Sequence, residues 1–393
     1  MLNLINGSII LTERCNLDCT FCYEKSRFQN DMDKDIVVKV INFMNSHYTH
    51  FKGCKRNIMW FGGEPFLNFE TLLHGYDYAK ESGYKGTHGI MTNATICSDK
   101  ILQEISIRPN LQVQLSWQGL AELQESFRGE AEIVEENIKR FLQLPNNIHI
   151  QIQVLPQSVD LLIHAVTKIY KTMGNKTGAI EVRPVPEVEG WNSKTLLTLN
   201  QSMSLLAKRY GSRLKRVWLC ANGHFSDELY CSPGKGFAAF SPSGDIYPCH
   251  RFYFLKDSRF KLGDVKSGLV STGISMDLDR MHRYCYKGCE TCVAEKTCFV
   301  CPAFNYENTG SLTKTIQQNC DVNRAYASAL APYINQKPQP QELDIRDYDD
   351  KAILQIAKIV NNCFDSISSI SNDLKKIKDQ EYFDKIDWKN RRF

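Results

Sequence analysis

The sequence lacks several features that would assign it to common classes of protein. No run of apolar residues approaches the roughly 20 needed to span a membrane, so we expect no membrane partner. The formal net charge is only +4 over 393 residues, which gives no basic excess for binding nucleic acid. The N-terminus has no basic segment ahead of an apolar one, and we therefore expect no signal peptide and a cytoplasmic location. We find no internal repeat.

Cysteine, by contrast, is abundant. Fifteen cysteines in a chain without an export signal favour metal ligands over disulfides, because a reducing cytosol keeps thiols free. The hydrophobic fraction of 42% is enough for a large core, and the length is typical of two or three domains.

The first half of the chain alternates short apolar segments with amphipathic ones. The pattern predicts strands at 7–14, 57–62, 87–93, 111–117, 148–155 and 179–185. It predicts helices near 33–48, 68–82, 98–106, 131–144, 158–173 and 192–213. Six β-α units indicate an α/β fold with a parallel sheet. They are too few for a closed eight-stranded barrel, and periodicity does not separate a partial barrel from a doubly wound sheet.

The composition changes at two later points. From about residue 216, glycine, proline and cysteine become frequent, and 237–249 is typical of a β-hairpin. Residues 334–345 resemble a linker, and a period near 3.5 follows from Ile353 to Ile377. That period predicts an amphipathic helix, packed on its own domain or on a partner. We therefore expect domains at 1–215, 216–333 and 334–393, and expect deletion of 346–393 to weaken peptide binding or dimerisation.

Cys15, Cys19 and Cys22 form a C-x3-C-x2-C motif, with Phe21 before the third cysteine. Three thiolates can hold three irons of a cubane cluster and leave the fourth iron open for a cofactor. A zinc site is the alternative, but zinc usually takes four ligands, and no other His or Cys lies nearby in the sequence. The motif resembles that of the radical S-adenosylmethionine (SAM) enzymes. The resemblance implies a partial (β/α)6 TIM-type barrel, a [4Fe–4S] cluster and SAM, which the cluster cleaves to a 5′-deoxyadenosyl radical.

Polar residues and glycines at the ends of later strands are candidates for binding SAM. By the same resemblance, Gly62, Gly63 and Glu64 bind the amino group of its methionyl part. Asn93 and Ser116 end the third and fourth expected strands, and the resemblance assigns Ser116 to the ribose. Many relatives read Ser-Leu-Asp-Gly where this chain reads Ser-Trp-Gln-Gly. Ordinary strand-end capping explains Asn93 and Ser116 equally well.

A second group of cysteines resembles the SPASM domain, a cysteine-rich module that holds auxiliary clusters. The resemblance implies one [4Fe–4S] cluster on four cysteines and a second on three: Cys289, Cys292, Cys298 and Cys320, then Cys231, Cys249 and Cys301. The fourth ligand of the second cluster is open, or is Cys220 or Cys285. The Cys298–Cys301 spacing is one residue shorter than in the family pattern. A four-cysteine zinc site at 289–301 is the alternative, and Cys54, Cys97 and Cys363 fit no pattern.

SPASM proteins commonly modify peptides. The segment Tyr247–Phe252 resembles maturases of ribosomally made peptides, which implies a thioether or C–C crosslink. His250 stands where sulfatase maturases have an Asp base, and an unperturbed His pKa suits that role. Formylglycine formation, peptide epimerisation with Cys220 or Cys285 as hydrogen donor, a dehydrogenase of small alcohols and a redox scaffold are the alternatives.

The resemblance also implies partners. These are a peptide substrate with a leader, a reductant such as flavodoxin or ferredoxin, and a helix-mediated dimer or partner protein. The first expected strand begins too early for an N-terminal leader-binding domain. We therefore expect the leader to bind to the barrel, to the C-terminal helix or to a separate protein.

Overall fold

A computed structural model describes most of the chain. The described residues are 4, 6–24, 29–48, 56–214, 232–270, 273–281, 285–286, 288–294, 298 and 300–334. Several predictions therefore fall outside the described residues. These concern Cys54, Cys220, Cys231 and Cys363, the linker beyond residue 334 and the C-terminal helix.

Ten strands of the described residues form one sheet, in the order β10-β9-β8-β7-β1-β2-β3-β4-β5-β6. Their bounds are β1 Asn6–Thr12, β2 Asn57–Gly62, β3 Thr87–Thr92, β4 Leu111–Ser116, β5 Ile148–Val154, β6 Ile180–Pro184, β7 Phe237–Phe240, β8 Asp245–Tyr247, β9 Gly263–Asp264 and β10 Gly268–Leu269. Strands β1 to β6 pair in parallel, and β6 does not pair with β10, so the sheet stays open. The predicted α/β partial barrel is confirmed.

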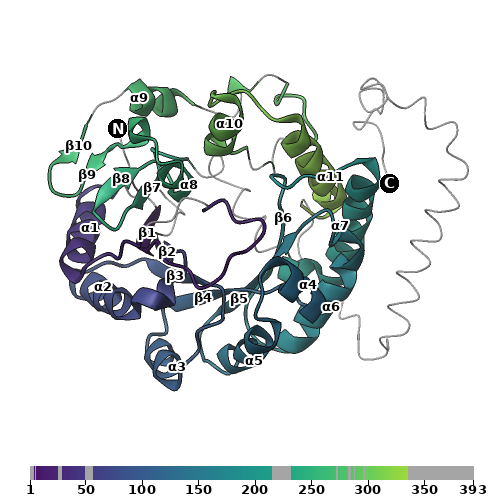
Figure 1. The fold of residues 1–393 in the computed structure, drawn as a ribbon, viewed down its shortest axis with the longest axis horizontal. Coiled ribbons are helices and arrows are strands. Elements are labelled where there is room, and N and C mark those ends of the chain that lie inside the picture. Colours follow the sequence, from purple (N-terminus) through teal and green to yellow (C-terminus); the bar gives the residue numbers. More distant parts are fainter. Residues whose placement is uncertain are drawn as a thin grey trace, which may run out of the picture.

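Helices surround the sheet (Figure 1). Their bounds are α1 Lys34–Ser46, α2 Phe69–Glu81, α3 Asp99–Ser106, α4 Ala121–Phe127, α5 Ala131–Phe141, α6 Leu162–Met173, α7 Ser193–Leu214, α8 His250–Phe254, α9 Gly273–Arg280, α10 Pro302–Thr309 and α11 Gln317–Ile334. Short 3-10 helices lie at η1 Pro65–Asn68, η2 Val159–Leu161 and η4 Ser258–Phe260. The sequence pattern did not predict α4 or the elements after β8.

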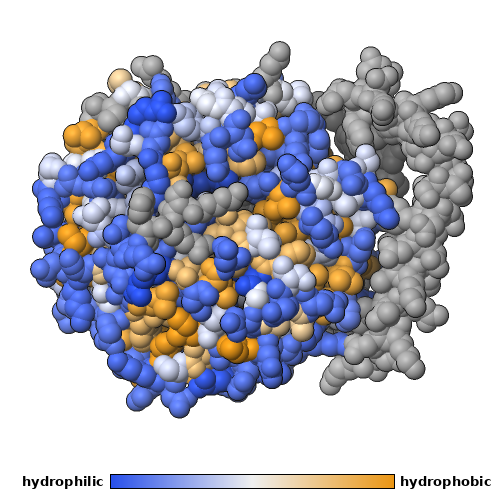
Figure 2. Space-filling model, in the orientation of Figure 1, coloured by the Kyte–Doolittle hydropathy of each residue, from blue (hydrophilic) through white to orange (hydrophobic). Residues whose placement is uncertain are grey.

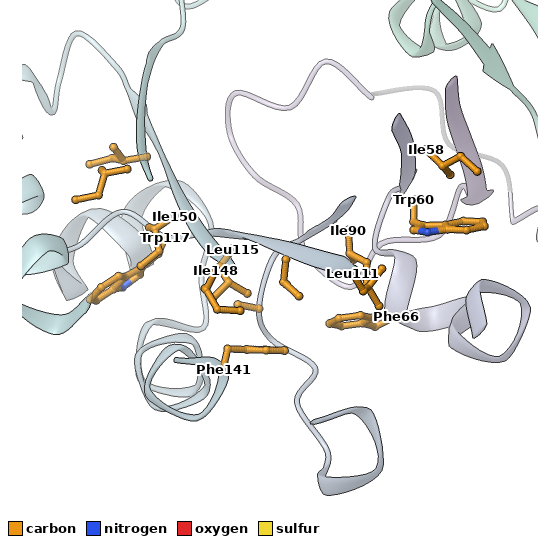
Figure 3. Packing of buried hydrophobic residues seen from close by; sticks show 14 of the residues in the cluster. Ile58, Trp60, Phe66, Ile90, Leu111, Leu115, Trp117, Phe141, Ile148 and Ile150 are labelled. Atoms are coloured by element: carbon orange, nitrogen blue, oxygen red, sulfur yellow. The ribbon is translucent and has the colours of Figure 1, made fainter. Parts of the chain in front are cut away.

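The core lies between the sheet and the helices that follow its strands (Figure 3). Register aligns apolar residues across five strands into one row: Ile9, Trp60, Ile90, Val113 and Ile148. All five are fully buried, and each side chain of this size contributes roughly 1.5 to 3 kcal/mol when it leaves water. This row belongs to the main core cluster and joins the first five strands to it.

The other face of the sheet carries a different set of side chains, because strand residues alternate between faces. On β1 to β3 these are mainly apolar, and Ile10 and Phe61 pack with Tyr253 and Phe254 of α8. On β4 to β6 they are polar and include Gln114, Ser116, Gln151, Gln153, Glu181 and Arg183. The inner face is therefore apolar on one side and rich in amide groups on the other.

The cysteine-rich half is joined directly to the barrel. Strand β7 pairs in parallel with β1, so the sheet continues through the proposed boundary near residue 216. Helix α11 packs along α7, and the Tyr326 hydroxyl donates to the carbonyl of Val182 in β6 at 2.7 Å. No helix in the described residues is long and apolar enough to cross a membrane. Figure 2 shows hydrophilic residues around the margin of one face and hydrophobic residues toward its middle.

Candidate active site

The loop after β1 carries Cys15, Cys19 and Cys22, all partly exposed. It leaves the carboxyl end of a parallel strand, the edge where ligands of such sheets bind. The amide of Cys22 donates to the carbonyl of Cys19 at 3.0 Å, which closes a tight turn between the two thiols. Three thiols therefore lie on one short loop at the edge of the sheet.

Backbone hydrogen bonds join this loop to the end of β2. The amide of Gly63 donates to the carbonyl of Thr12 at 3.0 Å, and the amide of Glu64 donates to the carbonyl of Arg14 at 2.8 Å. Gly62 has a φ of +146°, which side chains rarely allow. A Cβ added to Gly63 would lie 2.9 Å from the Cβ of Cys15. The two glycines let the two segments approach this closely.

The Glu64 carboxylate points into the protein and is 0% exposed. It accepts hydrogen bonds from the Phe66 amide at 3.1 Å, the Thr92 hydroxyl at 2.8 Å and the Asn93 amide at 2.8 Å. Burial raises the pKa of Glu64 to about 7, although the three donors oppose the shift. Glu64 thus ties the end of β3 to the turn after β2, and its predicted contact with SAM remains a prediction.

The raised pKa of Glu64 predicts a pH-dependent stability. The folded state keeps this carboxyl protonated up to about pH 7, whereas the unfolded chain releases the proton near pH 4.5. Stability therefore falls as the pH rises between these values. In chemical denaturation of the cluster-free protein, the wild type should lose roughly 2 to 3 kcal/mol more than Glu64→Gln from pH 5 to 8.

The control for this experiment is Glu70→Gln. Glu70 is exposed and bonded to Lys100 at 2.5 Å, and its pKa is lowered by that partner. This variant should therefore not remove the loss of stability between pH 5 and 8. Parallel stability curves for the wild type and Glu64→Gln would contradict the raised pKa.

Asn93 and Ser116 differ in their surroundings. The Asn93 amide group donates to Asn16 Oδ1 at 3.0 Å and lies 3.9 Å from Cys15 Sγ, while its oxygen accepts from Thr95. Asn93 therefore caps the end of β3 and also supports the cysteine loop. Ser116 ends β4 beside Gln151 and is partly exposed on the inner face.

Arg128 is a functional candidate that sequence reasoning missed. It follows α4, a helix of seven residues that gives only a weak periodic signal. The Phe127 carbonyl accepts from the Thr20 amide at 3.0 Å, and Arg128 Nη1 lies 3.8 Å from Cys19 Sγ. A helix more than a hundred residues along the chain thus contacts the cysteine loop.

Two groups of ion pairs anchor the region of α8, one to Glu13 just after β1 and the other to Glu187 and Glu307. Glu13 accepts from the Tyr253 hydroxyl at 2.7 Å and also pairs with Lys256. Arg251 is paired with Glu187 at 2.6 Å and with Glu307 at 2.7 Å. Buried pairs of this kind hold elements in register, since losing one partner leaves a charge unpaired.

His250 begins α8 and lies among aromatic rings. Its ring centroid is 4.7 Å from that of Phe61 and 6.0 Å from that of Tyr23. Burial, assisted by Arg183 and Arg251, lowers the pKa of His250 to about 4. The expectation of an unperturbed pKa was therefore wrong, because sequence does not reveal this environment. The imidazole is neutral near pH 7, and its role as a base remains a prediction.

The described cysteines of the second half lie in two places. Cys249 caps α8 and Cys301 caps α10, and burial together with the Cys301 thiol raises the pKa of Cys249 to about 12. Cys289 lies near Cys292 and Cys320, which contribute, after burial, to its raised pKa. Among the described residues, no three His, Cys, Asp or Glu side chains are arranged to hold a single metal ion. A cubane cluster needs a wider arrangement, because each thiolate binds a different iron.

Cys298 and Cys285 are the remaining described cysteines of the second half. The amide of Cys298 donates to the carbonyl of Ala294 at 2.7 Å, and Cys285 is exposed. The predicted ligand sets also need Cys231, which lies outside the described residues. The assignment of auxiliary ligands therefore remains a prediction.

Comparison with known proteins gives one family match and several similar folds. Residues 9–162 match the Radical SAM superfamily. An uncharacterized protein of Methanocaldococcus jannaschii is 32% identical over 112 residues, which is 28% of this chain and 37% of that protein. The alignment thus spans little more than a third of this relative.

Two solved structures share the fold over most of the chain. The structure of anSMEcpe with bound AdoMet has a TM-score of 0.64 at 15% identity, and the match covers 84% of this chain and 97% of that one. SuiB of Streptococcus suis, bound to the precursor peptide SuiA, has a TM-score of 0.61 at 15% identity, over 81% and 76% of the two chains.

The family match begins in β1 and includes both the cysteine loop and the Gly-Gly-Glu turn bonded to it. Residues 9–162 are therefore a radical SAM domain, the enzyme type that the sequence predicted, and the fold of the chain resembles those of anSMEcpe and SuiB.

Proposed function

We propose that this enzyme matures a ribosomally made peptide by forming a thioether or C–C crosslink. The observation that carries the proposal is the fold shared with SuiB, a protein whose structure was solved with its precursor peptide. The similarity covers 81% of this chain, more than the radical SAM domain alone. The amide-rich inner face of β4 to β6 also suits a peptide, because amides both donate to and accept from a peptide backbone.

The residues after β1 fit the cofactors that a radical SAM domain uses. Cys15, Cys19 and Cys22 supply three thiol ligands, and the buried cation Arg128 lies beside them. Gly62 and Gly63 let the end of β2 approach the same edge closely, since a Cβ on Gly62 would collide with Thr12 of β1 and one on Gly63 with Arg14 and Cys15. When bound, the cluster supplies an electron to SAM, and SAM supplies a 5′-deoxyadenosyl radical that removes a hydrogen atom from the substrate.

The protein's own residues position these groups. Glycines 62 and 63, with Asn93 and Ser116, would hold SAM at the carboxyl ends of β2 to β4. Glu64 would keep β3 and the turn after β2 in place through its three hydrogen bonds. The aromatic side chains around His250 would exclude water from one side of the site.

The second group of cysteines would hold the clusters that accept the electron left over from crosslinking. A crosslink replaces two bonds to hydrogen with one bond between substrate atoms, so the product has lost two electrons and two protons. One electron and one proton leave together as the hydrogen atom that the deoxyadenosyl radical removes. The second proton goes to solvent, and two auxiliary [4Fe–4S] clusters, with ligands as predicted from the family pattern, would carry away the second electron. A soluble reductant such as flavodoxin or ferredoxin would supply the electron for SAM cleavage.

Two measurements test this proposal. After anaerobic reconstitution, about twelve iron and twelve sulfide per chain are expected for three clusters. With SAM, a reductant and any short peptide found to be encoded beside this gene, the peptide should lose two hydrogen atoms in its mass spectrum, with one deoxyadenosine formed per crosslink. About four iron with bound zinc, or oxidation of a small alcohol and no peptide, would contradict it.

A further inference from the structure

Arg128 is a buried cation in contact with the cysteine loop. It is 9% exposed, and its Nη1 lies 3.8 Å from Cys19 Sγ. Its guanidinium carbon lies 4.9 Å from the ring centroid of Phe21, the residue before Cys22. Guanidinium groups do not lose their proton in proteins, so Arg128 brings a permanent positive charge to this loop.

This charge has no carboxylate partner in the part of the chain that the structure describes. Arg128 Nη2 donates to Gln153 Oε1, a neutral group, and its buried Nε has no hydrogen-bond partner. Burial lowers the pKa of Arg128, and the thiols of Cys19, Cys22 and Cys15 raise it. The cysteines of the loop are thus the nearest groups that can balance the charge.

Two other arginines near cysteines are arranged differently. Arg251 lies near Cys301 but is paired with Glu187 and Glu307. Arg324 bonds to Cys292 but lies 3.6 Å from a carboxylate oxygen of Asp321. In both places a carboxylate offsets the positive charge. Of these three arginines, Arg128 is the one that contacts a cysteine without a carboxylate partner to offset its positive charge.

We propose that Arg128 raises the reduction potential of the cluster bound by Cys15, Cys19 and Cys22. One electron passes from the reductant to the cluster, no bond breaks, and no proton is needed because Arg128 stays charged. The reduced cluster is one charge more negative, so a buried cation stabilises it more than the oxidised form. Cluster potentials respond to net charge and to hydrogen bonds on the sulfurs, and Arg128 provides both. The inference rests on the cluster in the proposed function and is independent of the substrate.

The first test is a redox titration of the reconstituted full-length enzyme, followed by EPR. The relevant signal is the one that changes when SAM is added, because the open iron binds SAM. Arg128→Gln should shift the reduction equilibrium at least tenfold toward the oxidised form, which is 59 mV for one electron. Arg128→Lys keeps the charge and should shift it by less. Equal midpoints for the wild type and Arg128→Gln, at equal iron content, would overturn the proposal.

A second variant keeps Arg128 in place and changes its partner. Gln153→Glu puts a carboxylate where Gln153 Oε1 now accepts from Arg128, so it offsets the charge without removing the side chain. It should shift the midpoint in the same direction as Arg128→Gln. The control is Gln112→Glu, which adds the same charge to the same face near the amino end of β4. It should shift the midpoint less than Gln153→Glu.

The combined results separate the possible failures. If Arg128→Gln assembles no cluster and Gln153→Glu titrates like the wild type, Arg128 is structural and the proposal is wrong. If Gln112→Glu shifts the midpoint as much as Gln153→Glu, any negative charge on this face lowers the potential. The effect would then not depend on Arg128, and the proposal would be wrong. A wild type with no SAM-responsive signal would instead refute the cluster in the proposed function. A shifted midpoint in an enzyme that modifies no peptide would leave this inference intact.

Discussion

A variant with alanine at Cys15, Cys19 and Cys22 is expected to hold about four fewer iron atoms per chain and to produce no deoxyadenosine. The three thiols lie on one loop at the carboxyl end of β1. Without ligands the cluster is lost, and no side chain can replace its one-electron chemistry. Iron analysis and chromatography of the reaction with SAM and dithionite measure both effects.

Cys97 offers a matched control for the loss of a thiol. It lies after β3, is partly buried, and burial raises its pKa to about 11. It belongs to neither cysteine pattern of the chain, and no predicted ligand set includes it. Cys97→Ala should therefore keep the iron content and SAM cleavage of the wild type. Deoxyadenosine formation by the triple variant at the wild-type rate would place the radical chemistry elsewhere.

The substitution Gly63→Ala is expected to disrupt the same site without removing any ligand. Its new Cβ would lie 2.6 Å from the carbonyl carbon of Arg14 and 2.9 Å from the Cβ of Cys15, closer than real contacts allow. Most of these atoms belong to the backbone, so relief requires the cysteine loop to move away from β2. We expect a loss of at least 2 kcal/mol in stability, as for other strained core substitutions, and a large loss of the SAM-binding cluster.

The control for Gly63→Ala is Gly89→Ala in the neighbouring strand β3. A Cβ on Gly89 meets no atom within 4 Å, and its backbone needs no positive φ. This variant should keep its melting temperature and iron content close to those of the wild type. If Gly63→Ala also keeps both, the close contact between the two segments is not needed for cluster binding.

Much of the fold was predictable from local patterns. The predicted strands at 57–62 and 111–117 agree with β2 and β4, and the predicted helix at 68–82 agrees with α2. Each of these elements buries one face in the same core. Its apolar residues therefore recur about every second residue in a strand and about every 3.6 residues in a helix. Helix α4 was missed because only Leu123 and Gln124 of its seven residues are buried. Such a short helix leaves no clear period.

The residues of the candidate site also differ in whether the sequence could predict them. Cys15, Cys19 and Cys22, and the run from Gly62 to Glu64, were recognised because their residues are close together in the sequence. The contact of Arg128 with Cys19 spans 109 positions, and the bond from Tyr253 to Glu13 spans 240. No local pattern encodes such a pair, since either partner is unremarkable alone. The inward direction of the Glu64 carboxylate and the lowered pKa of His250 were equally invisible.

Residue spacing alone was sufficient to propose the ligands of the cluster and to predict the strands that carry them, because thiol spacing and burial period are properties of short segments. The join of β7 to β1, the packing of α11 on α7 and the charge beside Cys19 became apparent only in the folded chain. These features arise when distant segments meet, and burial then sets the hydrogen bonds, charges and pKa values of the groups between them.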